Sequence, residues 1–317
     1  MKVIDFDWKL KSRIQNAIAL LPDALSYEVY FQVQRRFGGL KKPFDPMGHF
    51  ASGAWFLRKI REHGGSAEGK IFFEVGTGRV PIVPVAYWLG RAGKIITVDL
   101  NPYMRKELME DMFFYITKEE EKIRAIFGDL LDDGRFGALL EYGRAGKINV
   151  NEVLEMCEIE YLAPKDASKT GLPERSADYH TSNAVYEHIP REILKNILEE
   201  GNRIIKPDGL FINGIDYSDH FAQMDKGISQ INFLQYDEKE WDKYAGNRYM
   251  YMNRLRHDDF LGLFAEVGHE VIETETTKSE DAERILDEGK IKINERFKNK
   301  GNEILSIIGS SFITRKK

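Results

Sequence analysis

A short apolar run that ends in closely spaced glycines constrains this chain most. Residues 71–75 read IFFEV, and Gly76, Thr77 and Gly78 follow at once. A run without polar alternation is typical of a strand buried on both faces, as in a parallel sheet covered by helices. The glycines indicate a tight turn into a following helix, where a ligand can approach the backbone closely.

Alternating strand and helix signals continue along the rest of the chain. Helical spacing of apolar residues predicts helices over 190–207 and 258–268. Further strands are predicted within 94–102, 159–164, 177–186, 210–215, 269–276 and 303–315. Repeated strand–helix units followed by a terminal pair of strands indicate a doubly wound α/β sheet, which is a Rossmann-like arrangement.

Length and helical patterning suggest how the chain is divided. The chain has 317 residues, 42% of them hydrophobic, which fits one large domain with additions or two ordinary domains. We expect a helical cap or lid over 1–66 and a core over 67–317, with insertions at about 118–157 and 217–257. Thr117 and Glu120 have the spacing of a capping box for a helix in the first insertion.

Charge and cysteine content exclude several classes of protein. With 46 Lys and Arg against 51 Asp and Glu, the net charge of −5 disfavours nucleic acid and anionic membranes as partners. No apolar run approaches the ~18 residues that span a bilayer. Asp5 and Asp7 argue against a secretory signal, and the single Cys157 fits a reducing compartment. We expect a cytoplasmic protein, and the oligomeric state stays open.

A second feature supports a nucleoside site at the glycine turn. Asp99 ends the strand KIITV roughly 20 residues after the turn, where a carboxylate can accept hydrogen bonds from both ribose hydroxyls. A dinucleotide-binding turn would carry a third glycine, but Pro81 stands there. An oxidoreductase of the NAD type therefore remains only an alternative.

At these residues the chain resembles the class I S-adenosylmethionine-dependent methyltransferases, in particular the bacterial type 11-like group. The matching motifs and residues are EVGTG, VDL, the pair Asp166-Ala167, Leu172-Pro173, Asp178, Asn183 and the pair Glu187-His188. The resemblance implies a mixed seven-stranded sheet and S-adenosylmethionine as cofactor, with S-adenosylhomocysteine as product. It further implies that the cofactor is contacted by Glu74, Gly76, Thr77, Gly78, Asp99, Leu100, Asp166, Ala167 and Asn183.

The expected reaction is methyl transfer to a small-molecule acceptor, with a hydroxyl as the acceptor group. A hydroxyl must lose its proton, and histidine is the best general base near neutral pH. His220, just past the strand 210–215, is the first candidate, and His188 is the second. The alternatives are an exposed loop histidine for His220 and a pocket-shaping residue for His188. Asp216, Asp219, His220 and Asp225 are too loosely spaced for a metal site, so no metal is expected.

The aromatic-rich stretch that follows His220 allows two interpretations. Its aromatic and arginine side chains could stack on a sugar acceptor, and its sequence words resemble those of glycan-associated methyltransferases. A second small hydrophobic core explains the same residues equally well. The basic residues Arg35, Arg36, Lys41 and Lys42 could be a nucleic-acid arm, which keeps a nucleic-acid methyltransferase as an alternative, but a lid helix fits them better.

Overall fold

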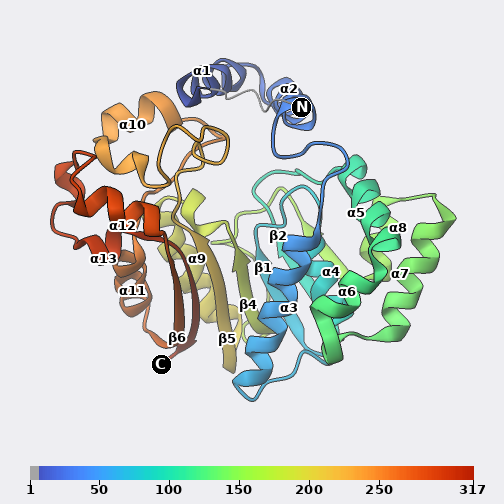
Figure 1. Ribbon diagram of the computed structural model, residues 1–317. Helices are drawn as coiled ribbons and strands as arrows, with labels where there is room; N and C mark the ends of the chain where they lie inside the picture. The colour runs from blue at the N-terminus through green and yellow to red at the C-terminus, as the bar shows by residue number, and fades with distance from the viewer. Residues whose placement is uncertain (1–6) are drawn as a thin grey trace.

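The computed structural model describes residues 7–317, so Asp5, used above against a secretory signal, lies outside the described residues. A single mixed sheet with helices on both faces dominates the molecule (Figure 1). Its strand order is β3-β2-β1-β4-β5-β7-β6. The strands are β1 Ile71–Val75, β2 Lys94–Val98, β3 Ile159–Leu162, β4 Ala177–Asn183, β5 Ile205–Asp216, β6 His269–Lys278 and β7 Ile307–Lys316. The predicted seven-stranded, Rossmann-like sheet is confirmed.

Strand direction brings the candidate residues to one edge of the sheet. Strands β1 to β5 are parallel to their neighbours, whereas β7 runs antiparallel to β5 and β6. Val75 pairs with Val98, and Asn183 pairs with Gly214. The segments that follow β1, β2, β4 and β5 therefore leave the sheet on the same side, where open α/β sheets bind ligands.

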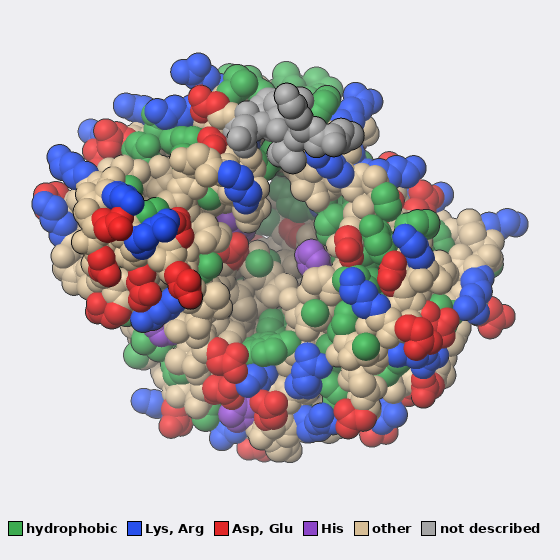
Figure 2. Space-filling view, viewed as in Figure 1, with side chains coloured by type: hydrophobic (Ala, Val, Ile, Leu, Met, Phe, Trp, Pro, Cys, Tyr) green, Lys and Arg blue, Asp and Glu red, His purple; other side chains and the backbone are tan. Residues whose placement is uncertain are grey.

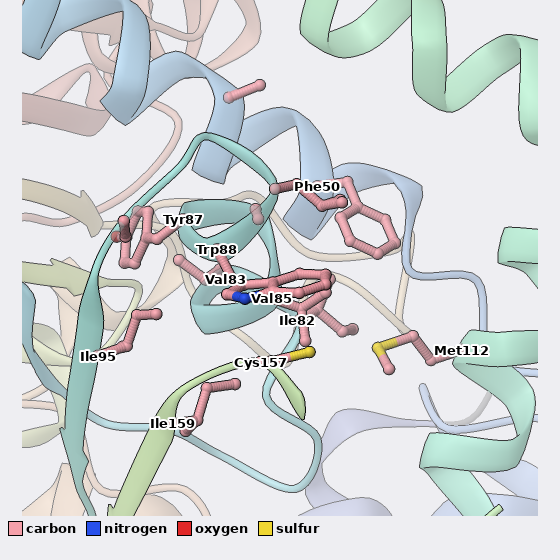
Figure 3. Close-up of a cluster of buried hydrophobic side chains, with 14 of the residues drawn as sticks. Phe50, Ile82, Val83, Val85, Tyr87, Trp88, Ile95, Met112, Cys157 and Ile159 are labelled. Carbon is pink, nitrogen blue, oxygen red and sulfur yellow. The ribbon is translucent and has the colours of Figure 1, made fainter. Parts of the chain in front are cut away.

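Within residues 7–317, one face of the sheet is covered by six helices. They are α3 Met47–Glu62, α4 Ile82–Leu89, α5 Lys106–Lys118, α6 Glu120–Phe127, α7 Asp133–Ala145 and α8 Val150–Met156. Every residue of α4 is buried, and Figure 3 shows its Ile82 and Val85 between Phe50 of α3 and Ile159 of β3. Cys157 lies in the same core as a buried thiol. Of the helical cap expected over 1–66, α3 therefore packs on the sheet face, and α1 and α2 lie over the sheet edge.

The opposite face is covered by two amphipathic helices. Helix α9 Arg191–Ile204 begins directly after Pro190 and buries Leu194, Ile197 and Leu198. Helix α11 His257–Glu266 adds Phe260 and Phe264. These side chains pack on Phe73, Phe211 and Phe312 of the sheet.

The upper part of the molecule lies across the carboxyl ends of the strands (Figure 1). Helices α1 Trp8–Ala19 and α2 Asp23–Phe37 cross above the sheet edge, beside α10 Glu238–Ala245. A third hydrophobic cluster joins α1, the segment after β5, α12 Glu280–Asp287 and α13 Asn302–Leu305. No helix formed by residues 7–317 has both the length and the apolarity needed to cross a bilayer.

Two sequence expectations change in the structure. The capping box of Thr117 and Glu120 is wrong: Thr117 lies inside α5 and donates to the carbonyls of Phe113 and Phe114, and α6 begins at Glu120 without a side-chain cap. The aromatic stretch is largely core, because Phe221, Phe233 and Trp241 are buried in the third cluster together with the arginine side chain of Arg254. Few of these rings are free to stack on an acceptor.

Candidate functional site at the carboxyl edge of the sheet

Two groups of candidate residues lie at this edge, and the surface is hollowed beneath α1 and α2 (Figure 2). The first group, the cofactor edge, comprises Glu74, the turn 76–79 and Asp99 with the residues that follow it. The second group, the histidine cluster, comprises Glu187, His188 and His220.

The two glycines of the turn are required for different structural reasons. Gly76 has φ +89°, and a Cβ there would lie 2.4 Å from Val185 Cγ2, so this glycine lets the segment after β4 pack on the turn. Gly78 has φ +70°, but a Cβ there would meet nothing within 4 Å. Both need the left-handed conformation that favours glycine. Of these two glycines, only Gly78 borders open space, as we expect of a residue beside a ligand.

Glu74 lies below the turn and is only 2% exposed. Thr97 Oγ1 donates to its carboxylate over 2.9 Å, and Thr77 Oγ1 lies 2.6 Å from Thr97 Oγ1. Burial raises the pKa of Glu74 to about 8, because the desolvation outweighs that hydrogen bond. The side chains of Glu74 and Thr77 therefore support the turn from inside, and the backbone of the turn is left to face a ligand.

Asp99 occupies the position expected of a ribose acceptor. Its Oδ2 accepts the N–H of Gly78 over 2.9 Å, so the carboxylate lies directly against the glycine turn. Burial raises the pKa of Asp99 to about 6, although the N–H of Gly78 partly offsets this effect. Leu100, the next residue, is 68% exposed. An exposed apolar side chain beside a nucleoside acceptor can support the flat face of a base.

Arg79 was given no role in the sequence analysis, and the structure places it in this region. Its guanidinium lies over the rings of Tyr30, Phe31 and Tyr103, at 5.6 to 5.9 Å from their centroids. Among the described residues it makes no ion pair. A hollow of about 50 Å³ lies beside it, lined by Tyr27, Arg79, Asn101, Pro102, Tyr103 and Arg105. A cation directly after a glycine turn is a signal that could have found it.

The other three predicted cofactor contacts lie on the segments that follow β3 and β4. The N–H of Lys165 donates to the carbonyl of Asp99 over 2.9 Å, which brings the segment after β3 to the cofactor edge. There the exposed Asp166 accepts from the N–H and the hydroxyl of Ser168, and Ala167 is buried. Asn183 ends β4 and is half-buried. Their contact with a cofactor remains a prediction.

Helices α1 and α2 are the expected lid, and α2 contacts segments on two sides of the sheet edge. Towards the cofactor edge, Arg105 pairs with Glu28 over 2.8 Å. Towards the segment after β5, Tyr30 stacks on Tyr249 with centroids 3.9 Å apart, and Arg248 pairs with Asp23 over 2.6 Å. Helix α2 therefore bridges the two sides of the edge, and its action as a lid remains a prediction.

The histidine cluster lies where β4 and β5 end. Glu187 and His188 belong to a short 3-10 turn, Tyr186–His188, and His220 follows β5. One ligand atom from each of Glu187, His188 and His220 lies within 4.8 Å of the others. The imidazole centroids are 4.9 Å apart. The sequence analysis proposed both histidines separately, and the structure brings them together.

Glu187 was listed above only as part of a sequence resemblance, yet it is the most unusual member of the cluster. It is 2% exposed, and neither carboxylate oxygen has a hydrogen-bond partner among the described residues. Burial raises the pKa of Glu187 well above its usual range, and the negative charge of Asp216 adds to the effect. A buried carboxyl group without a hydrogen-bond partner is costly, which makes Glu187 a candidate functional residue.

Contacts from the segment 251–253 hold the cluster in place. The N–H of Asn253 donates to the carbonyl of Glu187 over 2.8 Å, and its side-chain amide donates to the carbonyls of Tyr186 and Ile189. His188 Nδ1 lies 2.8 Å from the carbonyl oxygen of Tyr251. Since a carbonyl only accepts, Nδ1 carries the proton and Nε2 has a free lone pair.

The acidic residues considered together with His220 in the sequence analysis make separate contacts in the structure. Asp219 is buried and accepts from Asn232 and from the N–H of Phe221, and burial raises its pKa to about 6. Asp225 accepts from the N–H of Trp8. Asp216 Oδ2 lies 3.3 Å from His220 Nε2. Of these acidic residues, only Asp216 contacts the histidine cluster.

Comparison with known proteins finds matches among solved structures only. No family model and no curated protein matches the chain. One matching solved structure is geranyl diphosphate C-methyltransferase from Streptomyces coelicolor A3(2), in complex with Mg²⁺, geranyl diphosphate and S-adenosyl-L-homocysteine. The sequence identity is 10%, the match covers 84% of this chain and 79% of that chain, and the TM-score is 0.46. Magnesium protoporphyrin IX methyltransferase from Synechocystis PCC 6803 also matches, with bound SAH: 11% identity, 85% and 84% coverage, TM-score 0.44.

A third solved structure, an S-adenosylmethionine-dependent methyltransferase from Mesorhizobium loti, matches at 12% identity, with 84% of this chain and all of that chain (100%) covered and a TM-score of 0.44. All three solved structures are methyltransferases, the class that the sequence resembles. Identities and TM-scores this low leave the functional argument to the residues of the chain itself.

Proposed function

We propose that the protein is an enzyme that transfers a methyl group from S-adenosylmethionine to a small-molecule acceptor. The observation that supports this most is the contact between Asp99 and the N–H of Gly78, which unites the ribose acceptor and the glycine turn on adjacent strands. A nucleoside needs both features at one place. The resemblance in sequence to methyltransferases points to the same cofactor.

We propose a role in cofactor binding for each part of the cofactor edge. Asp99 accepts from the ribose hydroxyls, and Leu100 supports the adenine. The backbone at Gly76 to Gly78 faces the methionine portion, with Glu74 and Thr77 holding the turn from inside. Arg79, which has no carboxylate partner among the described residues, is available to the methionine carboxylate. Asp166, Ala167 and Asn183 complete the site from the neighbouring segments.

The acceptor end of the same cleft is the histidine cluster, with His220 and His188 as its catalytic residues. In the transfer, an acceptor oxygen forms a bond to the methyl carbon, the S–CH₃ bond breaks, and its electron pair goes to sulfur. Most of the rate should come from holding oxygen and methyl carbon about 3 to 3.5 Å apart. The hydroxyl proton must also leave, which is the step that the cluster would assist. A sugar or glycan precursor fits an oxygen acceptor of this kind.

Calorimetry with S-adenosylhomocysteine tests the proposal directly. We expect one site per chain and much weaker binding of NAD. Tighter binding of NAD would overturn the proposal in favour of an oxidoreductase. Mass spectrometry of the protein as purified, searching for retained S-adenosylhomocysteine, provides an independent measurement, and salt-sensitive RNA binding would favour a nucleic-acid substrate instead.

A further inference from the structure

We propose that Glu187, His188 and His220 together bind a divalent transition-metal ion at the acceptor end of the cleft. The structure brings one carboxylate and two imidazoles to a place where their ligand atoms lie within 4.8 Å of one another. This inference rests on the proposed function only for the molecule on which the ion acts, and not for the ion site itself.

The strongest evidence is the carboxylate of Glu187. Both oxygens are buried and lack any donor among the described residues, and one of them lies within 4.8 Å of a ring nitrogen of each histidine. Buried carboxylates are normally paired or bound to a metal. A cation between Glu187 and the imidazoles would give the carboxylate the partner that it lacks.

The protein also prepares the imidazole of His188 for ligation. Metal-binding histidines usually donate the second ring N–H to a carbonyl or carboxylate, which fixes the ring and its tautomer. His188 Nδ1 makes this contact with the carbonyl of Tyr251, so Nε2 is the free ligand atom. Asn253 holds the backbone of Glu187 at the same time. The site is therefore positioned by residues more than 60 positions away in the sequence.

The donor set indicates which ions would bind. Two imidazoles and one carboxylate suit first-row transition ions, whereas Mg²⁺ and Ca²⁺ prefer oxygen ligands alone. Three protein ligands also leave coordination positions open for an acceptor oxygen. A hydroxyl bound there loses its proton to water more readily, and the oxygen can then attack the methyl carbon. In this mechanism, His220 and His188 act through the ion rather than by accepting the proton themselves.

Titration of the tag-free full-length chain with Co²⁺ tests the inference, followed by calorimetry and by visible absorbance. We expect one ion per chain and affinity for Co²⁺ at least about 10-fold above that for Mg²⁺. Glu187→Gln and His220→Ala should each weaken Co²⁺ binding by at least about 10-fold. Glu192→Gln, at an exposed position of α9, and His63→Gln, at the far end of α3, are the matched controls and should bind as the wild type does.

Each outcome decides between clear alternatives. Absence of Co²⁺ binding by the wild type, or equal binding by Glu187→Gln and His220→Ala, would overturn the metal site. Glu187→Gln removes an unpaired buried acid and should unfold at no lower a temperature than the wild type without metal; should it fail to fold, His220→Ala carries the test. Calorimetry with S-adenosylhomocysteine on the same samples reports separately on the proposed function, because the cofactor edge lacks any residue of the cluster.

Discussion

The cofactor edge and the histidine cluster lie at the same edge of the sheet but are built in different ways. At the cofactor edge, Glu74, the glycine turn and Asp99 fall within 26 consecutive residues, and their contacts join residues of two adjacent strands and the turn. In the cluster, side chains from two strand ends meet, and Asn253 holds them from a distant segment. A site built from one short stretch of chain can be recognised from local sequence. A side-chain site needs the tertiary fold, because its support is non-local.

The largest expected effect concerns the cluster. His220→Ala should lower methyl transfer by about 100-fold or more, because the acceptor hydroxyl loses its activating group. The affinity for S-adenosylhomocysteine should stay within about twofold, since no cofactor-edge residue is changed. Single-turnover rates and calorimetry measure the two quantities, with His63→Gln as control. A joint loss of rate and cofactor affinity would show that the two regions are not separable.

The next largest effect concerns stability at the contact between the glycine turn and the segment after β4, which carries the histidine cluster's Glu187 and His188. Gly76→Ala should reduce the free energy of unfolding by about 2 to 5 kcal/mol. The added Cβ would strain a left-handed backbone conformation and would also collide with the side chain of Val185. Gly78→Ala should cost only about 1 to 2 kcal/mol, from strain alone. Denaturant titration gives both values. Combining Gly76→Ala with Val185→Ala should recover part of the loss, and no recovery would contradict the proposed collision.

A smaller effect is expected from the ribose acceptor. Asp99→Ala should weaken S-adenosylhomocysteine binding by about 1 to 3 kcal/mol, which is the range for a hydrogen bond to a charged group. Calorimetry at neutral pH measures this loss. Unchanged affinity would remove Asp99 from the site. Asp99→Ala should bind Co²⁺ at the cluster as tightly as the wild type does. It therefore changes the cofactor edge alone, whereas His220→Ala changes the cluster alone.

The pH dependence of cofactor binding follows from the same carboxylate. Burial raises the pKa of Asp99 to about 6, so the group is ionised above that pH and protonated below it. An ionised carboxylate accepts two hydroxyl hydrogen bonds, whereas a protonated one loses acceptor capacity. Affinity for S-adenosylhomocysteine should therefore be full near pH 8 and fall as the pH drops through about 6, by at most about tenfold per unit. Asp99→Asn should flatten this profile, and a wild-type profile that stays flat would contradict it.

The same division explains what could be predicted from the sequence. The first two strands were predictable because IFFEV and KIITV are short, mostly apolar runs, and the roles proposed for Gly78 and Asp99 follow from their positions after these two runs. The unpartnered carboxylate of Glu187 was not predictable, since its burial depends on packing by residues far along the chain. The capping box at Thr117 failed because α5 continues through that residue, and tertiary packing overrode the local signal.

The smallest expected effect distinguishes the two ties of the lid. Glu28→Gln breaks the pair with Arg105 at the cofactor edge, and Asp23→Asn breaks the pair with Arg248 on the other side. Pairs this exposed contribute at most about 1 kcal/mol to stability, so both variants should unfold close to the wild type. Glu28→Gln should nevertheless increase the dissociation rate of S-adenosylhomocysteine a few-fold, because it frees the lid where the cofactor would lie. Stopped-flow measurements would detect this increase, and an equal increase in Asp23→Asn would mean that the lid moves as one body over both regions.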